Sequence, residues 1–266
     1  MLKKSARHFP GQIVMFCAWA VSATLSTASA ADLHVLASTA LKPLFERVRP
    51  AFESATGDRL VLSWGASYGN APDTLPTRLS QGEKADVAVM IREALDEQIA
   101  GGYLRANTVR NIATSRLGLA VHSGARRPDI SDVEGLRRTL LGARSVAFSS
   151  GVSGKYVVST LLPRLGIAER ITPRSLVIDA PGLAGQALLS AQADVALQQM
   201  SELLAVPGIQ VVGPLPEAVQ RVSVIAAAVT SHAQQAQGAE AFIGYLQSLH
   251  TAQALKDSGF DPVVSP

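Results

Sequence analysis

Strand patterns alternate with helix patterns along this chain from Asp32 onward, and this alternation restricts the fold more than any other feature. Residues 33–37 are short, apolar and β-prone, and residues 39–55 then carry apolar side chains at helical spacing. Further strand patterns lie at 59–64, 85–91, 117–121, 146–148, 176–178, 195–198, 209–212 and 222–229. Such alternation predicts an α/β protein with mostly parallel sheets that are covered by helices.

Proline and glycine mark where the predicted helices bend or end. Pro50 is expected to kink or divide the helix predicted at 39–55, because proline removes a hydrogen bond and clashes with the preceding turn. Gly57 is expected to end this helix, and Gly259 is expected to end the last of two helices predicted at about 233–249 and 251–258.

The first 30 residues have the pattern of a secretory signal peptide. Lys3, Lys4 and Arg7 form a basic start, residues 13–21 are mostly apolar but too few to span a bilayer, and residues 28–30 form a small-residue cleavage pattern. We therefore expect a leader at 1–30 and export to the periplasm.

Removal of this leader changes what the composition implies. Taking 30 residues from 266 leaves 236, which is compatible with one large domain or two small lobes. The leader holds three of the 24 basic residues and none of the 21 acidic ones, so 21 of each sign remain and the net charge is near zero. This balance gives no bulk attraction to nucleic acid or to a membrane surface.

The residues after the leader exclude cysteine chemistry and a membrane-spanning segment. The single cysteine, Cys17, leaves with the leader, so the mature chain has no disulfide, thiol nucleophile or thiolate metal site. No later segment approaches about 18 uninterrupted apolar residues, so we expect a protein that is not embedded in a membrane. We expect it to be a monomer.

The loop 149–156, Ser-Ser-Gly-Val-Ser-Gly-Lys-Tyr, joins a strand pattern to a helix pattern. Its hydroxyls and its backbone N–H groups at the start of a helix favour a bound anion. Plain helix capping is an alternative, because serine before a helix is an ordinary cap. A second junction of this kind, at 37–40, and a glycine-rich turn at 64–70 give the anion-site reading more weight.

Catalytic and metal-binding motifs are absent from the sequence. None of the four histidines after the leader (His34, His122, His232 and His250) stands in a motif with a serine and an acid. Spacing typical of metal ligands is also missing, so we expect no metal and no cofactor. The polar stretch 123–132 indicates a boundary between two lobes, and ligands of open α/β sheets bind beyond the carboxyl ends of the strands.

Four short motifs, together with the order of elements, resemble the periplasmic substrate-binding proteins of the molybdate-binding type. They are, in chain order, 37–39 (Ala-Ser-Thr), 82–87 (Gly-Glu-Lys-Ala-Asp-Val), 191–196 (Ala-Gln-Ala-Asp-Val-Ala) and 212–216 (Val-Gly-Pro-Leu-Pro), within the same order of elements. The resemblance implies a two-lobed periplasmic binding protein (type II) with a ligand cleft between its lobes. Lobe one would then take 31–114 plus 222–266, and lobe two 115–221.

The resemblance also implies where a ligand would bind. Hydroxyl donors would fall on Thr39, or its neighbour Ser38, and on Ser67, and backbone donors of the second lobe would fall near Ser153 and around 182–183. Together with the Ser/Gly loop and the strand end at 198–199, the predicted ligand-binding residues are Ser38, Thr39, Ser67, Ser150, Ser153, Gly154, Lys155, Gly182, Gln198 and Gln199.

Departures from the molybdate-binding pattern point to a different anion. Gln199 stands where those proteins place a tyrosine, and the Ser/Gly loop adds the cation Lys155. A carboxylate ligand gains from charge-assisted partners such as Arg78, Arg92 or Lys155, whereas tetrahedral oxyanions can be held by neutral donors alone. A surface pair with Glu93 or Asp96 is the alternative role of Arg92.

Two functions remain open from the sequence. The first is a solute receptor of an ABC importer that closes on a small anion, an organic polycarboxylate in preference to molybdate, and meets a transporter permease. The second is an aconitate isomerase, because the exported branch of the family that contains these enzymes is matched as well as the true molybdate binders. Moving the double bond of aconitate needs a base and an acid, for which the candidates are Lys155, Tyr68 and Arg92.

Overall fold

The structure is a computed structural model that describes residues 30–69, 71–179 and 182–263. The predicted leader therefore lies outside the described residues except for Ala30. No helix within the described ranges combines the length and the apolar character that a membrane span requires.

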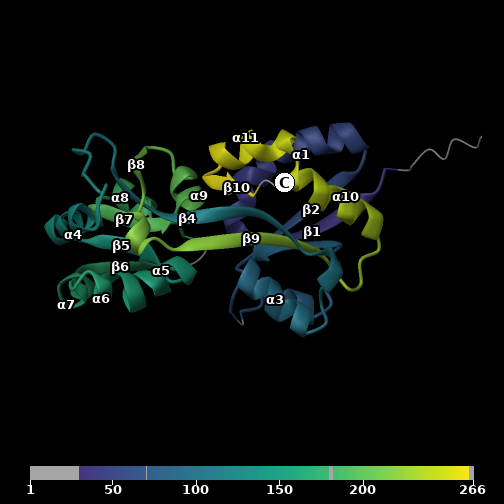
Figure 1. The fold of residues 1–266 in the computed structure, drawn as a ribbon, viewed down its shortest axis with the longest axis horizontal. Helices are drawn as coiled ribbons and strands as arrows, with labels where there is room; N and C mark the ends of the chain where they lie inside the picture. The colour runs from purple at the N-terminus through teal and green to yellow at the C-terminus, as the bar shows by residue number, and fades with distance from the viewer. Residues whose placement is uncertain (1–29, 70, 180–181, 264–266) are drawn as a thin grey trace, which may run out of the picture.

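Ten strands form one continuous sheet in two lobes (Figure 1). The strand path runs β2-β1-β3-β9-β4-β7-β5-β6, and β8 and β10 also pair with β4. The strands are β1 (Asp32–Ser38), β2 (Arg59–Gly65), β3 (Val87–Ile91), β4 (Arg110–His122), β5 (Val146–Ser149), β6 (Ser175–Ile178), β7 (Val195–Gln199), β8 (Ile209–Pro214), β9 (Val222–Val229) and β10 (Phe260–Pro262).

Helices cover both faces of the sheet in each lobe (Figure 1). In the first lobe, α1, α10 and α11 pack on one face and α2 and α3 on the other; in the second, α4 to α7 and α8 to α9 divide the faces in the same way. The helices are α1 (Lys42–Thr56), α2 (Leu75–Ser80), α3 (Arg92–Ala100), α4 (Val133–Gly142), α5 (Val152–Tyr156), α6 (Leu162–Arg164), α7 (Ala168–Ile171), α8 (Gln186–Leu189), α9 (Met200–Leu204), α10 (Ala236–Gln247) and α11 (Leu249–Asp257).

The alternation read from the sequence is confirmed, with three local differences. Helix α1 continues through the exposed Pro50 and is not divided there. Strand β4 begins at Arg110 instead of Leu117, because its first half lacks a continuous apolar pattern. Residues 157–161 form a π-helical turn between α5 and α6. Gly57 and Gly259 both have the left-handed conformation expected after a helix, with φ of 79° and 80°.

The pairing directions decide where the strand ends point. Strands β1, β2 and β3 are parallel, as are β5, β6 and β7, and every antiparallel pairing includes β4 or β9. Strand β4 leaves the first lobe and enters the second (Figure 1). Because β3 runs in the direction of β4 and β7 runs against it, the carboxyl ends of the two parallel sets face each other across the lobe junction.

Both predicted lobe boundaries fall on β4 and β9, the two strands that join the lobes. The boundary at 114/115 lies inside β4, and the boundary at 221/222 lies at the start of β9. The division into 31–114 plus 222–266 and 115–221 stays a prediction.

Gly154 lets helix α5 pack directly against the end of β5. A Cβ atom on this residue would lie 1.5 Å from the carbonyl oxygen of Ser149 and 3.2 Å from the ring of Phe148. These neighbours are backbone and buried core, so they cannot move aside at low cost.

We therefore expect Gly154→Ala to lower the free energy of unfolding by about 3 kcal/mol, measured by urea denaturation. Gly142→Ala is the matched control, because Gly142 is also helical but has no atom within 4 Å of its Cβ position. That variant should keep or slightly raise the stability. Equal midpoints for the two variants would contradict the close approach at Gly154.

Candidate functional site

A pocket of about 310 Å³ lies between the lobes, on the side where the strand ends face each other. Tyr68 contributes from the loop that follows β2, and residues of α5 and the π-helical turn contribute from the second lobe. The pocket is lined by Tyr68, Val152, Lys155, Tyr156, Ser159, Thr160 and Arg221. Its lining thus combines two cations, two phenol rings and two hydroxyls.

The two cations of this pocket have no acidic partner. Among the residues that the structure describes, Lys155 and Arg221 form no salt bridge, whereas Arg59, Arg78, Arg92 and Arg144 each pair with a carboxylate. Uncompensated positive charge in a concave site attracts an anionic ligand. The pocket therefore has the electrostatics of an anion site.

The Ser/Gly loop gives α5 a start without a side-chain cap. Gly151 is the N-cap residue and makes no capping bond, while Ser149 Oγ and Ser153 Oγ lie 2.9 Å apart and hydrogen-bond each other. The first N–H groups of a helix have no intrahelical acceptor, so those at the start of α5 remain available at this junction. No serine side chain of this loop caps α5, whose N-cap is Gly151, and Ser149 and Ser153 are paired with each other.

The hydroxyls predicted in the first lobe lie at the carboxyl ends of β1 and β2. Ser38 precedes a 3-10 turn, Thr39–Leu41, and its side chain caps no N–H group; Thr39 is exposed. Buried Ser67 accepts a hydrogen bond of 3.4 Å from the N–H of Ile91. The 3-10 turn contacts α9 of the second lobe, so these residues lie at the lobe junction.

The predicted donors at the ends of β6 and β7 are engaged in internal hydrogen bonds. The N–H of Gly182 donates to the carbonyl of Asp179 at 2.9 Å. Gln198 Oε1 accepts the N–H of Ala184 at 2.7 Å, and Gln199 Oε1 accepts from Ser115 Oγ at 2.8 Å. These side chains therefore hold the strand ends in place with their amide oxygens.

Arg92 and Arg78 are engaged outside the pocket. The Nε of Arg92 donates to Asp96 at 2.8 Å and its Nη1 donates to Asn111 at 3.0 Å, which is the surface pair that was the alternative role of Arg92. Arg78 pairs with Glu83 and donates to the carbonyl of Trp64 at 2.8 Å. Of the three candidates for chemistry, Tyr68 and Lys155 share the pocket and Arg92 does not line it.

Sequence reasoning missed Ser159 and Thr160 of the π-helical turn and also Arg221. Arg221 lies just before β9, in a stretch with no glycine-rich turn and no motif of the resembling family. Only the return of the chain between the lobes brings it beside Tyr156, with its guanidinium carbon 5.9 Å from the ring centre. The one sequence signal was its place directly before the long apolar strand pattern at 222–229.

Tyr68 keeps its proton at neutral pH. Burial raises the pKa of its hydroxyl, the negative charges of Glu93 and Glu97 raise it further, and the positive charge of Arg221 opposes the rise. A protonated phenol in the pocket can donate a hydrogen bond or a proton to a ligand.

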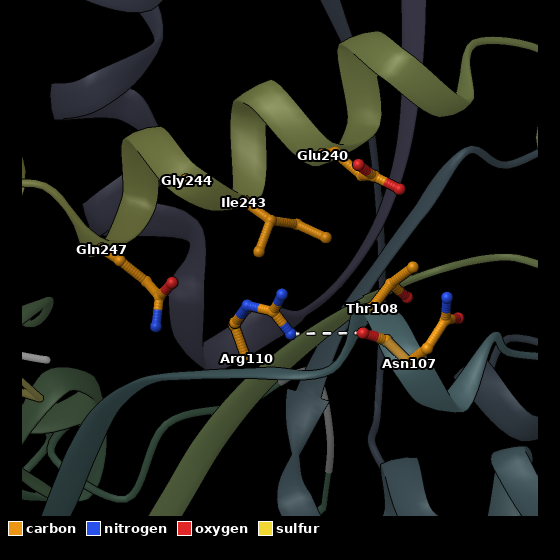
Figure 2. Close-up of a pocket in the computed structure, with 7 residues that line it drawn as sticks. All are labelled: Asn107, Thr108, Arg110, Glu240, Ile243, Gly244 and Gln247. Carbon is orange, nitrogen blue, oxygen red and sulfur yellow. Dashed lines mark hydrogen bonds between the residues drawn. The ribbon is translucent and has the colours of Figure 1, made fainter.

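A second pocket, of about 340 Å³, lies on the first lobe between α10 and the start of β4. Figure 2 shows Ile243 and Gln247 of α10 directed toward Arg110. The Nη1 of Arg110 donates to the carbonyl oxygens of Val109 at 2.8 Å and Asn107 at 3.3 Å, so this cation is partly used within its own turn. Within the described residues no cluster of histidine, aspartate and glutamate is suited to a metal ion in either pocket.

Comparison with known proteins agrees with this architecture. The model of the bacterial extracellular solute-binding protein family matches residues 33–261. The chain belongs to that family.

One relative and two solved structures are similar to this chain over most of its length. The aconitate isomerase of Pseudomonas sp is 36% identical over 231 residues, which cover 87% of this chain and 88% of the relative. The periplasmic molybdate-binding protein of Azotobacter vinelandii superposes with a TM-score of 0.68 at 20% identity, over 86% of this chain and 98% of that one. The sulfate-binding protein of Mycobacterium tuberculosis H37Rv superposes with a TM-score of 0.68 at 17% identity, over 88% of this chain and 87% of that one. The two structures show the fold, which is the predicted two-lobed type.

Glu202 is a second titratable group at the lobe junction. It lies in the first turn of α9, next to the strand end of β7. Burial raises the pKa of its carboxyl to about 7, and hydrogen bonds from the N–H of Gln199 and the side chain of Gln198 only partly oppose this rise. No charged neighbour contributes to the shift.

The raised pKa of Glu202 makes folding stability depend on pH. The folded state keeps a proton that the unfolded state, with an ordinary carboxyl pKa of 4.5, releases, so stability falls as the pH rises from about 4.5 to 7. Glu202→Gln mimics the protonated form and removes this loss. We expect the free energy of unfolding of the variant to exceed that of the wild type by about 2–3 kcal/mol more at pH 8 than at pH 5, measured by chemical denaturation.

The exposed Glu169 provides the matched control for this measurement. Glu169→Gln should change stability by less than about 0.5 kcal/mol at both pH values. An equal gain of Glu202→Gln at pH 5 and pH 8 would show that the carboxyl of Glu202 titrates normally.

Proposed function

We propose that this solute-binding protein is exported by its leader, holds a small polycarboxylate in the pocket between its lobes, and interconverts cis- and trans-aconitate. The observation that carries the proposal is the pocket lined by Lys155 and Arg221, two cations without acidic partners in the described part of the chain, beside the protonated Tyr68. A ligand with several carboxylates matches two separate cations better than a single tetrahedral oxyanion does.

Isomerisation needs the removal and return of one proton. A base takes a proton from the methylene carbon of aconitate; the electron pair of that C–H bond forms a new C=C bond, while the electrons of the old double bond move to its far carbon. That carbon then takes a proton, so atoms and charge balance. The intermediate spreads its negative charge over carboxylate oxygens, and fixed cations stabilise such charge as it develops.

The pocket supplies a group for each of these tasks. Arg221 cannot give up its proton in a protein and therefore acts as a fixed positive charge. We assign Lys155 as the residue that exchanges the proton with the carbon atoms of aconitate, and the phenol of Tyr68 as a hydrogen-bond and proton donor. Serine and threonine hydroxyls of the π-helical turn, at Ser159 and Thr160, line the same pocket and are suited to orient a further carboxylate.

The isomerase relative supports this proposal over that of a simple receptor. Its identity of 36% extends over nearly the whole chain, whereas the solved binding proteins for molybdate and sulfate are 20% and 17% identical. A periplasmic receptor that delivers a carboxylate to an ABC importer is the second candidate, which membership of the solute-binding family favours.

The test is to incubate the purified mature chain with cis-aconitate and to follow the trans isomer by chromatography. Lys155→Arg keeps the positive charge but cannot accept a proton, so we expect it to bind aconitate while its turnover falls at least about 100-fold. Lys256→Arg, on the exposed last turn of α11, is the matched control and should turn over as the wild type does.

Two outcomes would contradict the proposal in different ways. Full turnover by Lys155→Arg would show that this residue supplies only charge. No trans isomer from the wild type, together with a melting temperature that rises with a polycarboxylate, would identify a binding protein without this activity.

A further inference from the structure

We propose that Arg221 determines ligand specificity by receiving one carboxylate of the ligand on the two-pronged edge of its guanidinium group. This inference rests on the proposed function of the pocket as a polycarboxylate site. It adds which residue distinguishes a ligand with the full set of carboxylates from one that lacks a carboxylate.

The backbone around Arg221 is held in place before any ligand arrives. The side chain of Gln220 accepts the N–H groups of Arg221 and Leu117, both at 2.9 Å. Its Nε2 donates to the carbonyl oxygens of Leu117 at 3.1 Å and Leu215 at 3.0 Å. Two of these hydrogen bonds fix the segment that carries Arg221 to strand β4, and the one to Leu215 fixes it to the residue that follows β8.

The side chain of Arg221 is positioned as well. Its guanidinium group lies over the ring of Tyr156, and the hydroxyl of Tyr156 donates to the carbonyl of Val219 at 2.9 Å. Tyr156 is thereby tied to the residue two positions before Arg221. A cation that is already ordered loses less conformational freedom when it binds a ligand.

One donor of Arg221 is buried and has no partner. Its Nε atom is inaccessible to solvent and makes no hydrogen bond within the described residues. Because protein atoms cover Nε, the edge that Arg221 can offer to a ligand carboxylate in the pocket is the one formed by its two terminal nitrogens.

The position of Arg221 gives it access to both lobes. Tyr68 of the first lobe and Lys155 of the second line the same pocket, and the charge of Arg221 acts on the hydroxyl of Tyr68. A carboxylate on Arg221 is therefore held between the two groups to which the proton transfer was assigned. Because the guanidinium group of Arg221 is held over Tyr156, it fixes the position of the bound carboxylate and thereby the orientation of the rest of the ligand.

The test compares ligands that differ by one carboxylate. Binding of propane-1,2,3-tricarboxylate, glutarate and 2-methylsuccinate is measured by calorimetry for the wild type, Arg221→Lys and Arg221→Met; glutarate lacks the central carboxylate and 2-methylsuccinate a terminal one. We expect Arg221→Met to lower the affinity for the tricarboxylate about 100-fold, and Arg221→Lys about 10-fold, because lysine keeps the charge but not the planar fork.

The decisive readout is the preference between these ligands. In Arg221→Met, the affinity for the tricarboxylate should fall to about the affinity for one of the two diacids. The carboxylate that this diacid lacks is the one that Arg221 receives. Arg144→Met is the matched control, because Arg144 is exposed and paired with Asp194, and its binding constants should stay within about twofold of the wild type.

The outcomes separate this inference from the proposed function. Wild-type binding of the tricarboxylate with an unchanged preference in Arg221→Met overturns the role of Arg221 and leaves the polycarboxylate pocket standing. Absence of binding of all three acids and of aconitate by the wild type overturns both. An unchanged melting temperature of Arg221→Met without ligand excludes misfolding as the cause of a lost affinity.

Discussion

The antiparallel pairing of β4 with β9 is the constraint on which the rest of this structure depends. These two strands carry the chain from one lobe to the other and back, and all antiparallel pairing in the sheet includes one of them. Because the parallel strands of the two lobes pair with them in opposite senses, six carboxyl ends face one junction. Backbone hydrogen bonding alone thus decides where the polar loops of both lobes meet.

The fold was predictable because its signals are local. Strands such as 33–37 and 222–229 are apolar runs of the right length, and glycines such as Gly57 and Gly259 mark helix ends by a conformation that other residues avoid. The first half of β4 escaped prediction because only Ile112 and Ala113 are apolar in its first five residues, although both are buried in the first-lobe core. Pro50 was judged by its local effect, but the helix continues through it, held by the packing of its buried face, which includes Phe45, Val48 and Phe52.

The site was predictable only where its residues belong to a turn. Lys155 and Tyr68 follow strand ends with glycine and hydroxyl residues, so the sequence placed them beside a ligand, and the pocket contains both. Arg221 depends on a contact between segments that are 65 residues apart, Tyr156 and its own, and no local pattern reports such a contact. Conversely, Arg92 follows a strand end but bonds to Asp96 and Asn111, because a neighbouring helix turn and strand offer it acceptors.

The continuous sheet has a mechanical consequence for a protein of this family. Since the lobes share one hydrogen-bonded ribbon of two long strands, a rotation of one lobe against the other is absorbed as twist along β4 and β9, spread over many backbone dihedrals. No single loop has to act as a pivot. The Gln220 side chain hydrogen-bonds to Leu117 of β4, and the Gln199 side chain accepts from Ser115 of the same strand. Two side-chain amides thus brace β4 where it enters the second lobe.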